Sequence, residues 1–242
     1  MGMMQTKLVV AMGSIIEDKA LQNRVSVFGD RTEAGRRVAS LIVRERIDDN
    51  PVVCAIPAGG VPIGIEVARA LGCPLRMAVV RKVQIPWNPE AGFGAVTWDG
   101  RVFLNQDLLA GLRLTDEAVD AAVEKARRSV KERLAMFVGD RKEPPLSDTT
   151  VILTDDGLAS GYTMFAAVRA ARSEGPREVV VAVPTGSADA VTFLAREADL
   201  VICTNVRTGY AFAVAEAYER WYDLSDRDVK DILKQAQDMG LF

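Results

Sequence analysis

Short apolar segments that alternate with helix-like segments restrict the fold of this chain more than any other feature. Runs this short and continuous, each ending in a turn, are typical of strands buried on both faces of a sheet. The runs lie at 52–57, 75–80, 151–154, 179–184 and 200–204. Segments with helical apolar spacing lie around them, at about 31–46, 63–71, 115–137, 161–173 and 188–196. The alternation predicts an α/β fold with a mainly parallel sheet, helices on both faces, and ligands at the carboxyl ends of the strands.

Three further segments complete the predicted organisation. Residues 84–94 are rich in Pro, Gly, Trp and Asn and predict a loop. Residues 94–105 predict a hairpin with Asp99–Gly100 as its two-residue turn. Near the C-terminus, Ser225 and Asp228 form a capping box that predicts the start of a last helix. We expect one domain with a loop-rich cap.

The composition excludes several kinds of chemistry. The chain has no histidine, which rules out a Ser-His-Asp triad, a Cys-His pair and imidazole ligands for zinc. Acid–base chemistry near neutral pH must then come from a carboxylate, Lys, Tyr or Cys, or from the substrate. The net charge of −3 argues against a globally basic nucleic-acid-binding protein.

The cysteines and the N-terminal segment bear on location. Cys54, Cys73 and Cys203 are far apart, and an odd number without a disulfide framework indicates a reducing compartment. No apolar run reaches the roughly 20 residues of a transmembrane helix. Residues 8–16 resemble a short signal sequence, but the acidic pair at 17–18 occupies the place of a cleavage site. We expect a strand or helix there, a cytoplasmic location and no membrane contact.

The segment 151–163 carries the strongest indication of function. A buried strand is followed by two adjacent carboxylates, Asp155 and Asp156, and then by small residues that lead into a helix. Gly157 and Gly161 allow the backbone to approach a ligand closely. Free N–H groups at a helix N-terminus attract an anion, so this loop favours a phosphate.

Two more side chains and the acidic pair refine that ligand. Ser160 and Thr163 add hydroxyl donors beside the helix N-terminus. The aspartates would repel a phosphate and should face a sugar diol or a hydrated cation instead. The alternative is a capped helix with two surface carboxylates, which paired acids followed by G-x-x-x-G argue against. The loop matches neither G-x-G-x-x-G nor the P-loop pattern.

The run Asp-Asp-Gly-x-Ala-Ser-Gly-x-Thr at 155–163 resembles the phosphoribosyl pyrophosphate (PRPP) motif of type I phosphoribosyltransferases. The segments FGDRTEAGRRVA, AIPAGGVPIGIEVARALG, VVRKVQIPWNPEAGFGAV and WYDLSDRDV are similar to a branch of that family. The resemblance covers about residues 28–233. It implies a phosphoribosyltransferase-like domain over 28–242, with a flap hairpin and a small hood, and leaves residues 1–27 as an N-terminal segment outside it. The loop at 84–94 corresponds to the mobile flap of the family.

The resemblance also implies a role for each matching residue. Asp155 and Asp156 would hold the ribose 2′- and 3′-hydroxyls of PRPP. The 5′-phosphate would be bound by Gly157, Ala159, Ser160, Gly161, Tyr162 and Thr163. Pyrophosphate would be bound by Ala58, Gly59, Gly60, Arg81 and Lys82. The catalytic set would be Arg81, Lys82, Asp155 and Asp156.

A largely electrostatic mechanism follows from the resemblance. Pyrophosphate leaves C1′ through an oxocarbenium-like state, which a nitrogen nucleophile attacks. Mg²⁺ is the implied cofactor, held by the ribose hydroxyls and pyrophosphate and through water by Asp155 and Asp156. Related proteins carry Pro-Arg-Gly-Gly where this chain has Ala58, so one cation near pyrophosphate is missing. We expect weaker PRPP affinity or slower turnover from that departure.

The acceptor site is less well defined by the sequence. The family holds the base under an aromatic hood, and Phe212 is the preferred candidate for base binding. The other candidates are Trp87, Tyr210, Trp221 and Tyr222. The basic stretch 124–143 is interpreted as a solvated helix face, with a phosphate of a neighbouring subunit or of RNA as the alternative.

The sequence therefore predicts a PRPP-dependent phosphoribosyltransferase, a glycosyltransferase of the pentosyltransferase class. It would transfer the 5-phosphoribosyl group to a nitrogenous acceptor, a nucleobase of nucleotide salvage, and release pyrophosphate. PRPP and a small-molecule acceptor are the expected partners, with a homodimer as the assembly. One alternative is a non-catalytic PRPP- or nucleotide-sensing regulator on the same fold. Another is a hydrolase or phosphorylase acting on a phosphorylated ribose.

Overall fold

The structure, a computed structural model, describes residues 13–46, 50–209 and 212–242. Its central sheet has the strand order β1-β9-β8-β7-β2-β3, and every neighbouring pair is parallel. The strands of this sheet are β1 (Ser14–Glu17), β2 (Pro51–Ala55), β3 (Leu75–Met77), β7 (Thr150–Thr154), β8 (Glu178–Ser187) and β9 (Leu200–Arg207). The predicted α/β fold with a mainly parallel sheet is confirmed.

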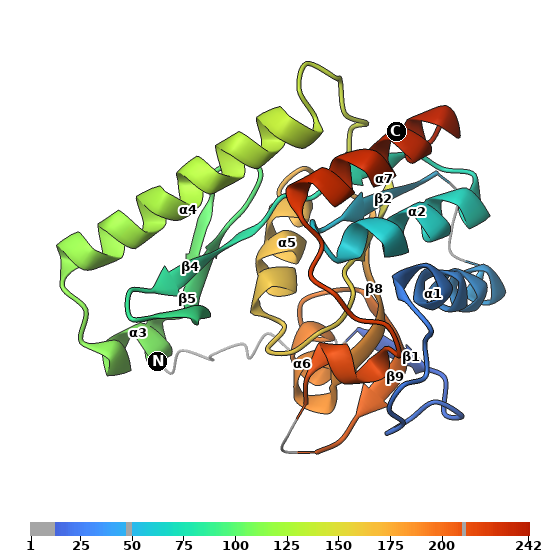
Figure 1. Cartoon of the computed structure of the whole chain (residues 1–242), viewed down its shortest axis with the longest axis horizontal. Helices are drawn as coiled ribbons and strands as arrows, with labels where there is room; N and C mark the ends of the chain where they lie inside the picture. The colour runs from blue at the N-terminus through green and yellow to red at the C-terminus, as the bar shows by residue number, and fades with distance from the viewer. Residues whose placement is uncertain (1–12, 47–49, 210–211) are drawn as a thin grey trace, which may run out of the picture.

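Helices cover both faces of this sheet, as Figure 1 shows. One face packs against α1 (Arg31–Glu45), α2 (Gly60–Leu71) and α7 (Asp226–Asp238). The other face packs against α5 (Tyr162–Arg172) and α6 (Ala188–Leu194). Successive strand residues alternate between these two layers: Ile152 joins the first hydrophobic cluster, and Val151 and Leu153 join the second. The central strands are apolar on both faces because both faces are buried.

A second, antiparallel sheet extends from the side of the first. It contains β4 (Arg81–Ile85), β5 (Asn88–Val96) and β6 (Val102–Leu104), and α3 (Gln106–Leu112) follows it. The long helix α4 (Asp116–Phe137) lies along this sheet (Figure 1). Val83, Ile85 and Phe93 are buried in the same cluster as residues of α4, which holds the small sheet against the helix.

Three local predictions need correction. The strand predicted for 75–80 ends at Met77, since β2 ends at Ala55 and leaves 78–80 no strand to pair with. The loop predicted for 84–94 forms most of the β4–β5 hairpin, because its apolar residues alternate toward α4. The hairpin after it exists, but its turn is longer than Asp99–Gly100: the N–H of Gly100 donates to the carbonyl of residue 97 (2.9 Å), so residues 98–99 are central.

The ends of the chain also take part in the fold. Of the segment predicted at 8–16, residues 8–12 lie outside the described part, and residues 14–16 belong to β1, which pairs with β9. The capping box at Ser225 and Asp228 is present at the start of α7. Among the residues that the structure describes, no helix is long and apolar enough to cross a membrane.

A buried ionic network fastens the small sheet to the central one. The Arg76 guanidinium, on β3, makes two bonds of 2.9 Å to Glu174 and lies 3.3 Å from Glu143. Trp98, in the turn between β5 and β6, donates its indole N–H to the Glu174 carboxylate (2.9 Å). Burial raises the pKa of Glu143, so this carboxylate depends on its cationic partner.

Replacing Arg76 with Leu should lower the free energy of unfolding by about 3 kcal/mol, because two partly buried carboxylates, Glu143 and Glu174, lose their partner. The matched control is Arg101→Leu, whose ion pair with Asp99 is half-exposed and should contribute less than about 1 kcal/mol. Urea unfolding of both variants measures the difference. Equal losses would show that the network does not anchor the small sheet.

Candidate active site

Three loops meet at the carboxyl ends of β2, β3 and β7, where a parallel sheet of this kind binds ligands. Residues 56–59 follow β2, residues 78–80 follow β3, and residues 155–161 lead from β7 into α5. The loops after β2 and β7 are neighbours because these strands pair in register. The residues predicted to bind pyrophosphate and phosphate are therefore adjacent.

The loop after β2 packs directly on the start of the loop after β7. The Thr154 hydroxyl donates to the Gly60 carbonyl (3.2 Å). A Cβ at Gly60 would overlap the Thr154 carbonyl, and a Cβ at Gly59 would overlap the Asp156 carboxylate. The contact therefore requires glycine at both positions. The Pro57–Ala58 peptide in this loop is cis.

The helix α5 starts without a capping side chain. Its N-cap is Gly161, with a φ of 75° that favours glycine and no side chain to accept from the first turn. One long side-chain bond reaches this turn, from the Tyr162 N–H to the Ser160 hydroxyl (3.4 Å). Asp155 instead accepts the Asp156 N–H (2.9 Å). The capped-helix alternative is therefore wrong for both aspartates, and the first N–H groups of α5 stay accessible to an anion.

A polar cleft of about 320 Å³ brings several predicted site residues together. Lys82, Asp155 and Thr163 line it, along with Arg81 and with residues 56–57 of the loop after β2. One cleft thus contains a carboxylate, a cation and a hydroxyl beside the accessible end of α5. These are the groups needed to bind a sugar that carries phosphates.

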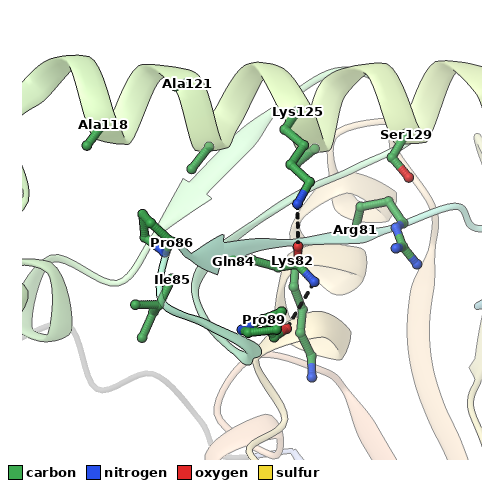
Figure 2. Close-up of a pocket in the computed structure, with 12 residues that line it drawn as sticks. Arg81, Lys82, Gln84, Ile85, Pro86, Pro89, Ala118, Ala121, Lys125 and Ser129 are labelled. Carbon is green, nitrogen blue, oxygen red and sulfur yellow. Dashed lines mark hydrogen bonds between the residues drawn. The ribbon is translucent and has the colours of Figure 1, made fainter.

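The strand β4 separates this cleft from a second groove. Figure 2 shows the groove between β4 and α4, with Lys82 extending to the side of the strand away from α4. Lys125 of α4 donates to Gln84 (3.1 Å), and Gln84 donates to the Pro89 carbonyl (2.9 Å). The hairpin predicted as a flap is therefore tied to α4 beside the cleft.

Several other predicted residues differ in their surroundings. Arg81 lines the cleft but is the first residue of β4, because the chain leaves the central sheet before it. Burial, and then the nearby Arg133, lower the pKa of Arg81. Ser160 and Tyr162 line a different hollow on the α5 side, and Gly157 contacts Val214.

The folded chain disfavours the charged forms of Asp155 and Asp156. Burial raises the pKa of Asp155 well above its ordinary value, and the adjacent Asp156 raises it further. Burial also raises the pKa of Asp156, while Arg31 opposes that shift. Groups whose charged form is penalised in this way are typical of functional sites.

Sequence reasoning missed Arg31, the partner of Asp156. Its Nε donates to Asp156 Oδ2 (2.8 Å), and only 8 % of its side chain is exposed. Its guanidinium lies 3.9 Å from the centre of the Trp221 ring and donates to the Tyr222 carbonyl (2.9 Å). The available indication was the family-like segment FGDRTEAGRRVA, in which Arg31 directly follows Asp30, the N-cap of α1.

The segment after β9 covers the loop after β7. Tyr218 donates its hydroxyl to the Asp156 carbonyl (2.6 Å), and Val214, in the 3₁₀ helix η1 (Val214–Ala217), lies where a Cβ on Gly157 would be. Phe212 lies beside Arg207, with the guanidinium 5.8 Å from its ring centre, and does not line the cleft at Lys82.

The remaining hood candidates are scattered. Trp87 is exposed on the β4–β5 hairpin, and Tyr222 is also exposed. Trp221 stacks on Arg31, and Tyr210 lies outside the described residues.

Part of the basic stretch 124–143 is a solvated helix face, as interpreted from the sequence: Arg127, Arg128 and Lys131 are exposed on α4. Arg133 instead pairs with Asp226 of α7, and residues 138–143 follow the end of α4.

No cluster of three or more His, Cys, Asp or Glu side chains that could ligate a metal occurs within the described part of the chain. A metal bound here would rely on Asp155 and Asp156 and on oxygens of a ligand. That donor set fits Mg²⁺, which keeps waters and commonly binds one or two carboxylates plus substrate phosphates.

The profile of the phosphoribosyl transferase domain matches residues 30–218, which contain all three loops. The chain belongs to this family. Rv0571c of Mycobacterium tuberculosis (strain ATCC 25618 / H37Rv), whose name assigns it provisionally to the phosphoribosyl transferases, is 37 % identical over 212 residues. That match covers 88 % of this chain and 47 % of the relative, so the chain spans about half the length of such relatives.

Two further proteins are similar to this chain. The crystal structure of TT1426 from Thermus thermophilus is 36 % identical, with a TM-score of 0.70 over 86 % of this chain and 98 % of that one. The amidophosphoribosyltransferase of Escherichia coli (strain K12) is 27 % identical over 161 residues, 66 % of this chain and 25 % of that enzyme.

The electrostatic cost at Asp155 predicts a stability gain on neutralisation. The raised pKa means that the folded state holds more protons than the unfolded state between the two pKa values, so stability falls as pH rises through that interval. Asp155→Asn should be more stable than the wild type by roughly 1 kcal/mol at pH 7, in the absence of ligands.

This gain should shrink as the pH falls toward the ordinary Asp value of 3.8. Urea unfolding in a chelator-containing buffer measures it, with the exposed Asp120→Asn as the matched control. A destabilised Asp155→Asn, or a gain independent of pH, would contradict the assignment of a strained carboxylate.

Proposed function

We propose that the chain is a PRPP-dependent phosphoribosyltransferase that transfers the 5-phosphoribosyl group to a nitrogenous acceptor, a nucleobase in the simplest case, and releases pyrophosphate. The observation that carries this proposal is the cleft in which Lys82, Asp155 and Thr163 meet beside the uncapped start of α5. Membership of the phosphoribosyl transferase family supports the donor.

PRPP fits the polarity of the site. The N–H groups and hydroxyls of 159–163 would bind the 5′-phosphate, and Asp155 and Asp156 would accept hydrogen bonds from the ribose hydroxyls. The pyrophosphate would lie at Ala58, Gly59 and Gly60, with Arg81 and Lys82 as the cations. Gly59 is packed against the Asp156 carboxylate, and Gly60 is packed against the Thr154 carbonyl.

The side chains act chiefly through charge. As the bond from C1′ to pyrophosphate breaks and the bond from C1′ to the acceptor nitrogen forms, negative charge grows on pyrophosphate and positive charge grows on the ribose ring. Lys82 would stabilise the leaving charge, and Asp155 would face the cationic ring. Mg²⁺, when bound with PRPP, would offset pyrophosphate charge, and Asp155 and Asp156 are the residues suited to hold it through water.

The acceptor would lie under the segment that follows β9. We propose Phe212 as the base-binding residue because this segment covers Gly157 and continues from the carboxyl end of β9. The free, buried state of all three cysteines supports a reducing, cytoplasmic location. The homodimer stays a prediction of the resemblance.

A regulator that senses PRPP or a nucleotide is the second candidate. The observation that favours it is Ala58, which leaves the pyrophosphate loop without the cation of related proteins. Such a protein would bind PRPP and release no pyrophosphate.

Pyrophosphate release from PRPP and Mg²⁺, measured with a panel of purine and pyrimidine bases, tests the proposal. At least one base should support turnover, and Lys82→Gln should lower kcat about 100-fold, since it removes a group that stabilises transition-state charge. Lys131→Gln, an exposed position on α4, is the matched control and should leave kcat unchanged. PRPP binding without turnover on any base would support the regulator instead.

A further inference from the structure

Arg31 is a buried cation shared between the candidate active site and the C-terminal part of the chain. It is the first residue of α1, and it reaches Asp156 at one end of its guanidinium and the Tyr222 carbonyl at the other. The flat guanidinium face lies on Trp221. A planar fork can make these contacts together, whereas a lysine ammonium cannot.

The segment that carries these aromatics is fixed to the residues before Arg31. Tyr218 forms a parallel bridge with Phe28. The N–H of residue 219 donates to the Phe28 carbonyl (2.8 Å), and the N–H of Arg220 donates to the carbonyl of residue 29 (3.1 Å). An ion pair of 2.7 Å between Arg220 and Asp30 adds to this link. These backbone hydrogen bonds hold residues 218–222, here called the strap, against residues 28–29. Arg31 is therefore packed between the strap and Asp156.

This packing decides where the second aspartate faces. Oδ2 of Asp156 accepts from Arg31, and the same carboxylate lies against Gly59. The Tyr218 hydroxyl fixes the backbone of Asp156 through its carbonyl. Asp155, by contrast, lines the cleft with Lys82. The two carboxylates therefore differ: Asp156 is held in one orientation by a residue outside all three loops.

We propose that Arg31 is a positioning residue that orients Asp156 toward a ribose hydroxyl and so makes the site select ribose over deoxyribose donors. This inference rests on the proposed function, because it assigns the aspartates to the sugar of PRPP. A carboxylate in a fixed orientation keeps a strong preference for a ligand that offers a hydroxyl, since a ligand without one leaves a buried acceptor unpaired. Without Arg31 the carboxylate can turn, and the preference falls.

The strap would extend this role to the acceptor side. Since Arg31 contacts Trp221 and the strap continues from the segment that contains Phe212, a displacement of the strap would change the orientation of Asp156. Arg220 offers the matched control. It belongs to the same strap and pairs with Asp30, but 68 % of its side chain is exposed and its ion pair does not include Asp156.

The test is calorimetric binding of ribose 5-phosphate and its 2-deoxy and 3-deoxy analogues. The wild type should prefer ribose 5-phosphate to at least one analogue by about tenfold or more. Arg31→Gln should reduce that preference to about twofold or less, and Arg31→Lys should lie between, because it keeps the charge without the fork. Arg220→Gln should keep the wild-type preference. The affinity for inorganic pyrophosphate, which a loosened fold would lower, should stay unchanged in all variants.

The outcomes separate this inference from the proposed function. A wild type that binds neither PRPP nor ribose 5-phosphate overturns the proposed function. A wild type that binds both, with an Arg31→Gln variant that keeps the full hydroxyl preference, overturns the positioning role alone. If Arg31→Gln does not fold by circular dichroism, Arg31→Lys replaces it, since it keeps the charge and loses the planar fork that bonds Asp156 and the Tyr222 carbonyl together. A preference unchanged by Arg31→Lys then overturns the role.

Discussion

Two carboxylates buried side by side at the end of β7 constrain much of this structure. Their charged forms carry a cost in the ligand-free fold, because burial raises the pKa of both carboxyls and Asp156 raises the pKa of Asp155 further. The fold accommodates them with Arg31 on one side and the glycines at 59–60 on the other. A site that carries such a cost before its ligand arrives is prepared to bind hydroxyls and cations, which relieve it.

The rest of the molecule holds the loops around this pair in place. The parallel sheet brings the ends of β2 and β7 together, and its two hydrophobic layers make that edge rigid. The network of Arg76, Glu174 and Trp98 fixes the small sheet, from which Lys82 extends into the cleft. The position of Lys82 in the cleft thus depends on contacts outside the cleft. The strap at 218–222 makes a third such connection through Arg31.

The sequence predicted the parts of the fold that depend on local pattern. Continuous apolar runs indicated the central strands, and the capping box indicated the start of α7, because each of these signals depends on residues that are close together in the chain. The β4–β5 hairpin was predicted as a loop, since its Pro and Gly content obscures an alternation whose burial is provided only by α4. The turn at 98–99 was misplaced because Trp98 is anchored by a distant glutamate.

The candidate site also has a part that the sequence predicts and a part that depends on the three-dimensional fold. The loop 155–163 is contiguous and carries its own chemistry, so its nature could be predicted from spacing. Arg31 lies 125 residues from Asp156 in the chain, and no local pattern connects the two. The different surroundings of the two aspartates, and the way Gly157 faces Val214, likewise depend on tertiary packing. Sequence reasoning identifies such residues only when their partners are nearby in the chain.

The most direct test of this account is a calorimetric titration of PRPP, with Mg²⁺, into the wild type and into an Asp155→Ala/Asp156→Ala double variant. The account predicts binding to the wild type and no measurable binding to the folded double variant, since the ribose would lose both of its acceptors. Equal PRPP affinity in the two proteins would contradict the central claim that this buried acidic pair holds the sugar.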